Sequence, residues 1–420
     1  MSTLKIYATI VSHVRSRSDL TRLCLVSRGF KQAARYSLYN TLSITVGPRT
    51  EENMLLRTLA TTPETTRVVN ALSIRLLPNA ATGILACALR TAERLQFLEI
   101  TGGTLPPASG EPPPSTVLEG VRFQLKSLTC DVRPDLDLAK FLDAQRELED
   151  LTLTGGHAAY DKDIHSGQTA MGAISPGALP MLRSLECDAR LAAILVPGRC
   201  IHRLHAWVED DGDYPALTRA LRATASGPVS LEVLCPDDAA ALSLLGAASS
   251  EARYLGTLSL PVDSIVRLKA YGLLFRLSQI ETLAIDISCW NPPPASHRAL
   301  RAIACEIAIY ARALRRVAFN GPAAWRGSGA LPNAGRSRRC ISRAYSSPFP
   351  SRAPSPRLTS RPSSPWLISR PASSQPGPYN HGPHSDGFES DEGDAIVLSL
   401  VDGLWILDED AMPEYLWRET

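Results

Sequence analysis

Two histidines and a cysteine lie close enough in the 420-residue sequence to raise the question of metal chemistry. His202 and His205 form an H-x-x-H pair just after Cys200, and imidazole nitrogen and thiolate sulfur are ordinary zinc ligands. Both histidines belong to an alternating apolar segment, Ile201 to Ala206, in which residues three apart face opposite sides of a strand. We therefore interpret them as core or surface histidines and predict no metal site.

Four carboxylates crowd the stretch that follows: Glu209, Asp210, Asp211 and Asp213. Carboxylates bind Ca²⁺, but this spacing is not that of an EF-hand loop. We interpret the stretch as a solvated loop at a strand end. Such a loop has the charge to attract a basic segment of a bound protein.

The sequence contains no catalytic motif of the common types. It holds no G-x-x-x-x-G-K-S/T, no G-x-G-x-x-G and no H-E-x-x-H. We therefore predict a non-catalytic protein with no catalytic residues and no cofactor. The net charge of +2 argues against nucleic acid as the partner of the whole chain.

Cysteine usage and hydropathy bear on the compartment. The nine cysteines include no C-x-x-C pair, and several lie inside apolar runs, as reduced core cysteines do. Apolar runs stay shorter than a membrane-spanning helix requires. We expect a protein of the cytoplasm, the nucleus or both, with no membrane partner.

A six-residue pattern, apolar-x-x-apolar-x-apolar, recurs through residues 46–320, and the segments between the copies have the apolar spacing of helices. The copies predict an α/β array of short strands in parallel, neighbouring positions. The predicted strands are Leu95–Ile100, Leu125–Cys130, Leu148–Leu153, Leu182–Cys187, Leu255–Leu260 and Ile280–Ile285.

This array resembles the leucine-rich repeat family, which implies an irregular solenoid with the parallel strands on one face. The family usually places an Asn three residues after the last strand Leu, but Gly103, Arg133 and Gly156 occupy those positions here. No Asn ladder can then tie the turns together. The alternative is a general α/β domain whose strands are rich in leucine.

The amino-terminal segment, residues 1–45, predicts three short helices. Apolar residues of Leu4 to Val14 share one face, Ser18 or Asp19 can cap a second helix, and Ser27 opens a third. Three short helices cannot bury a good core alone, so the segment needs a partner.

The string DLTRLCLVSRGF, followed by LYNTLSI, resembles the fungal type of the F-box family over residues 4–44. The resemblance implies the substrate-recognition subunit of a cullin–RING ubiquitin ligase of the SCF type. The box would bind the Skp-type adaptor, and the repeats would bind a protein substrate. The implied adaptor-binding residues are Ile6, Ile10, Leu20, Leu23, Val26 and Phe30. The alternative is a leucine-rich-repeat scaffold outside the ligase, because Lys5 stands where the family usually has Pro after Leu4.

Two segments follow the array. Residues 321–385 contain nine Arg and no acidic residue, and their Ser- and Pro-rich composition predicts disorder. Residues 386–420 contain 11 acidic residues and only Arg418 as a base. The apolar centre of this acidic segment, Ile396 to Asp410, alternates enough to add a strand or cap at the end of the array.

Overall fold

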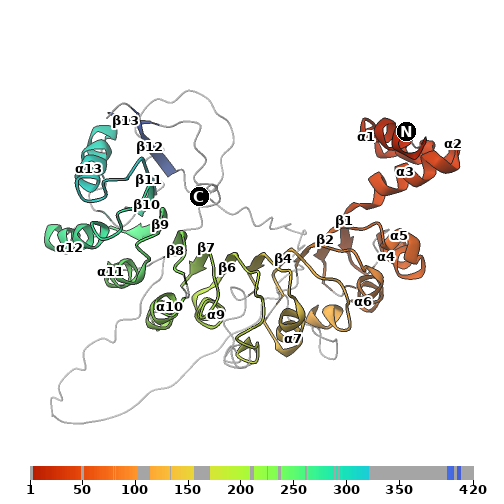
Figure 1. The fold of residues 1–420 in the computed structure, drawn as a ribbon, viewed down its shortest axis with the longest axis horizontal. Coiled ribbons are helices and arrows are strands. Elements are labelled where there is room, and N and C mark those ends of the chain that lie inside the picture. Colours follow the sequence, from red (N-terminus) through yellow and green to blue (C-terminus); the bar gives the residue numbers. More distant parts are fainter. Residues whose placement is uncertain are drawn as a thin grey trace, which may run out of the picture. The chain divides into compact units, whose positions relative to one another are not determined.

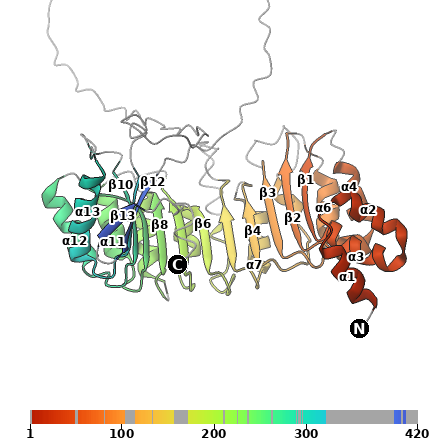
Figure 2. The ribbon, with the colours of Figure 1, turned by 90° about the horizontal axis from the view of Figure 1, so that it is seen from above.

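The computed structural model describes residues 3–320, 395–401 and 404–407, apart from gaps at 49–51, 79, 81, 103–113, 133, 156–170, 209–211, 225, 235–237, 261–262, 288–289, 291–293 and 295. The described strands form one 13-stranded sheet in which each strand pairs with the next along the chain (Figures 1 and 2). Strands β1 to β11 are parallel, so the predicted α/β class with parallel neighbouring strands is confirmed. The parallel strands are β1 (Thr41–Val46), β2 (Ala71–Leu76), β3 (Phe97–Thr101), β4 (Ser127–Cys130), β5 (Asp150–Leu153), β6 (Ser184–Asp188), β7 (Arg203–Trp207), β8 (Ser230–Leu234), β9 (Tyr254–Ser259), β10 (Thr282–Asp286) and β11 (Arg316–Asn320).

Helices connect the parallel strands and lie along one face of the sheet (Figure 1). Each strand sends its alternate apolar residues to that face, as Leu98 and Ile100 of β3 do, and these side chains are buried. The connecting helices are α4 (Glu52–Thr61), α5 (Pro63–Thr66), α6 (Thr82–Thr91), the 3₁₀ helix η1 (Pro114–Leu118), α7 (Leu136–Ala144), α9 (Ala189–Leu195), α10 (Asp213–Arg222), α11 (Asp238–Ala247), α12 (Ser264–Leu274) and α13 (His297–Tyr310). We call the opposite side of the sheet the open face.

The observed strands begin later than the six-residue pattern in five of the six predicted cases. Leu95, for example, is fully buried but precedes β3, which begins at Phe97. The first apolar residue of the pattern therefore packs in the turn before the strand. The sheet also begins earlier than predicted, because β1 pairs with β2 from Thr41 onward and so falls across the expected boundary at residue 45.

A backbone ladder joins successive units where an Asn ladder is missing. The carbonyl oxygen of Asn70, just before β2, accepts hydrogen bonds from the amides of Gln96 (2.9 Å) and Phe97 (3.1 Å) at the start of β3. The same pattern recurs at every junction from β1 to β11, and the accepting residues are Asn40, Asn70, Gln96, Lys126, Glu149, Arg183, His202, Val229, Arg253 and Glu281. Because only main-chain atoms take part, the turns need no particular side chain and the repeats can be irregular in sequence.

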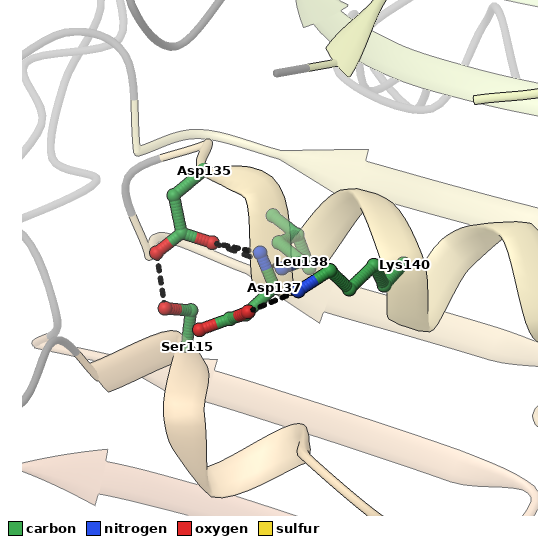
Figure 3. Close-up of polar contacts among 5 residues, drawn as sticks. All are labelled: Ser115, Asp135, Asp137, Leu138 and Lys140. Carbon is green, nitrogen blue, oxygen red and sulfur yellow. Dashed lines mark hydrogen bonds and ion pairs between the residues drawn. The ribbon is translucent and has the colours of Figure 1, made fainter. Parts of the chain in front are cut away.

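A partly buried polar contact fixes the start of α7 in this stack (Figure 3). The Asp135 carboxylate accepts hydrogen bonds from the amides of Asp137 (3.1 Å) and Leu138 (2.9 Å), so it caps the helix. Its second oxygen accepts a hydrogen bond from the hydroxyl of Ser115, which lies in η1 and is wholly buried. Asp135 therefore joins η1 to the start of α7. Lys140 Nζ, by contrast, lies 3.2 Å from Asp137 Oδ1 at the surface of α7.

The carboxyl end of the array is covered by two antiparallel strands. β12 (Ala395–Val401) pairs with β11, and β13 (Leu404–Leu407) pairs with β12. The prediction of an added strand within Ile396 to Asp410 is confirmed. The predicted disordered segment, residues 321–385, and the rest of residues 386–420 lie outside the described residues.

Candidate protein-binding surface

The three amino-terminal helices pack on a small core of their own. They are α1 (Thr3–Ser12), α2 (Arg17–Val26) and α3 (Arg28–Tyr39). Val11, Leu20 and Ala34 form this core, one residue from each segment, and are at most 5% exposed. A core of this size leaves much of the apolar content of three helices near solvent.

Serine side chains cap the second and third helices. Ser27 accepts a hydrogen bond from the amide of Phe30 (3.2 Å), which confirms it as the residue that opens the third helix. The second helix begins earlier than predicted: Ser16, and not Ser18 or Asp19, is the N-cap and accepts from the amide of Asp19 (3.3 Å). Asp19 then lies in the first turn, where its charge complements the helix dipole.

A close approach of α1 and α3 depends on Gly29. The ring of Tyr7 packs against Phe30 with centroids 4.6 Å apart, and it passes so close to Gly29 that a Cβ atom there would overlap the ring. The absence of a side chain at Gly29 therefore lets the Tyr7 ring pack, tilted, against Phe30 at the amino end of α3.

The structure separates the six residues that were predicted to bind an adaptor into two sets. Leu20 belongs to the small core, and Leu23 and Phe30 pack against it partly buried. Ile6, Ile10 and Val26 instead expose 51%, 43% and 66% of their surface. The first set holds the helices together, whereas the second is available to a partner.

Other exposed apolar residues belong to the same helices. Leu25, next to Val26 on α2, is 86% exposed, and Tyr36 on α3 is 59% exposed. Sequence reasoning missed both, because an amphipathic reading of a ten-residue helix assigns apolar residues to its buried side. Together with Ile6, Ile10 and Val26 they form what we call the outer apolar set.

The third helix connects this helical unit to the array. Arg35 Nη1 lies 3.4 Å from Glu64 Oε2, and Arg35 Nη2 donates a hydrogen bond to the hydroxyl of Thr65. Both partners belong to α5. Thr65 is buried, so the arginine side chain reaches into the first strand–helix unit. This contact ties α3 to the array through side chains as well as through the chain itself.

The acidic stretch after β7 differs from the prediction where the structure describes it. Glu209, Asp210 and Asp211 lie outside the described residues. Asp213 is not solvated: it is 7% exposed, lies in the first turn of α10 and forms an ion pair with Arg190 at 2.7 Å. Its position at a helix start, next to an arginine, explains why it is buried rather than presented to a partner.

Among the residues that the structure covers, no group of three His, Cys, Asp or Glu side chains is arranged to hold a metal ion. His202 is exposed before β7, and Cys200 is also exposed. None of the described helices is both long and apolar enough to cross a membrane. No protein-family model matches the chain, and no curated protein matches its sequence.

Proposed function

We propose that this chain is the substrate-recognition subunit of a cullin–RING ubiquitin ligase of the SCF type. The three amino-terminal helices act as an F-box that binds the Skp-type adaptor. The strand–helix array acts as a leucine-rich-repeat-like solenoid that binds a protein substrate.

The outer apolar set carries this proposal. The folded helical unit exposes Ile6 and Ile10 on α1 and Leu25 and Val26 on α2, and covering these apolar side chains with a partner gains free energy. Ile6 and Ile10 are four residues apart on α1 and so lie on one side of that helix. The resemblance of DLTRLCLVSRGF to the F-box family names the partner.

The role requires no catalytic group on this chain. A receptor that holds its substrate beside the transfer machinery replaces a bimolecular encounter by a local one at high effective concentration. A long array on the same chain as the helical unit suits that task, because the two binding surfaces lie on different elements.

Co-purification with a Skp-type adaptor tests the proposal. We expect the wild-type chain to retain purified adaptor at micromolar concentration, and substrates to accumulate on it when the proteasome is blocked. Failure of the wild-type chain to bind adaptor at that concentration contradicts the proposal. The chain would then be a repeat scaffold outside the ligase.

A further inference from the structure

The helix layer, on the side of the sheet away from the open face, ends in two helices that expose large apolar side chains. On α12 and its C-cap, Ile265, Leu268 and Phe275 are 67%, 54% and 57% exposed. Their spacings of three and seven residues place them on one side of that helix. On α13, Ile309 is 69% exposed. We call these four residues the outer face of α12 and α13.

Contacts between the two helices make these residues parts of one surface. The rings of Tyr271 on α12 and Tyr310 on α13 stack with their centroids 5.1 Å apart. The guanidinium of Arg312, just after α13, lies over the Phe275 ring at 6.0 Å from its centroid. The two helices are therefore packed side by side at both of these positions.

The exposed charges of α12, of α13 and of the two residues after each helix are mainly basic. The exposed basic residues are Lys269, Arg276, Arg298, Arg301 and Arg312. The acidic groups of the same helices already have partners. Asp263 caps α12 by accepting a hydrogen bond from the amide of Ile265 (2.7 Å), and Glu306 Oε1 lies 3.9 Å from Arg267 Nε. The surface therefore favours a partner that is both apolar and negatively charged.

The chain itself contains a segment of that kind. Residues 408–420, which lie outside the described residues, read DEDAMPEYLWRET. They hold five acidic side chains against Arg418 alone. Among these acidic residues lie four large apolar or aromatic ones, namely Met412, Tyr415, Leu416 and Trp417.

This segment begins close to the outer face. It follows β13, which ends at Leu407, and β13 lies beside α13 (Figures 1 and 2). Its 13 residues span about 40 Å when fully extended, whereas the 11 residues of α12 are about 16 Å long. The segment is therefore long enough to lie along both helices.

We propose that residues 408–420 fold back onto the outer face of α12 and α13, with their apolar side chains on that face and their carboxylates near its basic side chains. Tethering favours this occupant over a second copy of the chain, because a linked segment acts at an effective concentration on the order of millimolar. The contact would cover the end of the helix layer, as β12 and β13 cover the end of the sheet.

Photo-cross-linking in the full-length chain tests this placement. Tyr415 is replaced by the photoreactive residue p-benzoylphenylalanine, and mass spectrometry identifies the peptide to which it becomes attached. We expect cross-links within one chain to residues 264–276 or 297–312. Leu268→Asp and Ile309→Asp should each lower the yield of these cross-links about fivefold or more, because the contact would bury an unpaired charge.

Met54→Asp is the matched control. Met54 is 65% exposed on α4, so this variant adds the same charge to a similarly exposed apolar position near the other end of the helix layer. It should change the cross-link yield less than about twofold. Thermal melts of the three Asp variants establish that each remains folded.

Hydrogen exchange of the unmodified chain gives a second measurement. We expect the amides of residues 408–420 to exchange at least about tenfold more slowly than in a free peptide of the same sequence. Exchange as fast as in the peptide, cross-links to another part of the chain, or an equal loss with Met54→Asp overturns the inference. Cross-links between two chains assign the face to a second copy and overturn it as well.

The inference is independent of the ligase role. Ile309→Asp changes no residue of the amino-terminal helices and should retain the adaptor at the wild-type level. Val26→Asp should leave the cross-links of residue 415 unchanged.

Discussion

Leu20 and Val26 lie on the same ten-residue helix, α2, yet Leu20 is 5% exposed and Val26 is 66% exposed. A substitution at Leu20 therefore tests the folding of the helical unit, whereas a substitution at Val26 tests its binding to a partner. Val26→Asp places a charge on a surface that already faces water, so the free chain should fold. Burying that unpaired charge against an adaptor should cost about 4 kcal/mol, or roughly a thousandfold in affinity. A pull-down with purified adaptor measures the loss.

Two companion variants make the first prediction specific. Leu20→Asp should unfold the three helices, because its charge would lie in their core, and circular dichroism will detect the lost helix. Arg22→Ala changes a side chain that is 78% exposed and should cost roughly 1 kcal/mol or less in adaptor binding. Undiminished adaptor binding by Val26→Asp would remove α2 from the interface.

Gly29→Ala should destabilise the amino-terminal helices, although alanine is normally the better helix former. The new methyl group would overlap the Tyr7 ring, and displacing that ring should cost about 1–3 kcal/mol. Gly272→Ala on α12 is the control, since its Cβ meets no atom within 4 Å and should stabilise the chain by about 0.5–1 kcal/mol. Chemical denaturation followed by circular dichroism compares the two variants. An increase in the free energy of unfolding for Gly29→Ala would show that the Tyr7 ring moves freely.

Asp135→Ala should lower the free energy of unfolding by about 2–4 kcal/mol. The variant removes the cap of α7, worth about 1 kcal/mol, and leaves the buried Ser115 hydroxyl without its acceptor, which costs about 1–3 kcal/mol. Asp137→Ala, which breaks only the surface contact to Lys140, should cost less than about 1 kcal/mol. Urea denaturation measures both, and equal losses would rule out a special role for Asp135.

Cysteine accessibility should divide five of the six described thiols into two groups, whereas Cys24 is only partly exposed. Burial raises the pKa of Cys130 to about 12 and that of Cys187 well above its ordinary value, so neither forms thiolate near neutral pH. Cys87, Cys200 and Cys305 are exposed and should react first with a thiol reagent. Mass spectrometry of briefly alkylated native protein identifies the sites. Early labelling of Cys130 would mean that β4 opens readily.

The link between Asp143 and Ser175 should make part of the stability depend on acid pH. The Ser175 hydroxyl and amide both donate to Asp143 Oδ1, and these hydrogen bonds lower the pKa of that carboxyl below its ordinary 3.8. A lowered folded-state pKa means that the stabilisation is complete above the unfolded value and is lost as the pH falls through the folded one. Asp143→Ala should therefore lower the urea midpoint at pH 6, where the carboxylate is ionised, and have little effect on it near pH 2. A shift of equal size at both pH values would contradict this origin.

The sequence by itself determined the layout of the sheet. Alternation in segments such as LQFLEI specifies a strand with one buried side. The helix-like segments between the copies act as crossover connections, which join parallel neighbours, as β3 and β4 show. The same reasoning located the added strand at the carboxyl end. The pattern could not locate the strand starts, because in five of the six predicted copies the first apolar residue is buried in the turn before the strand, and only in the copy at Leu255 does it lie within the strand.

The tertiary structure decided which side chains are presented. On three short helices, the identity of the exposed apolar residues follows from how α2 packs on α3, and a periodicity over ten residues does not encode that packing angle. Leu268 and Ile309 belong to separate units, so only the packing of α12 against α13 places them on one surface. Local sequence patterns report the period and side of each element, whereas proximity between elements depends on long-range pairing that no single segment contains.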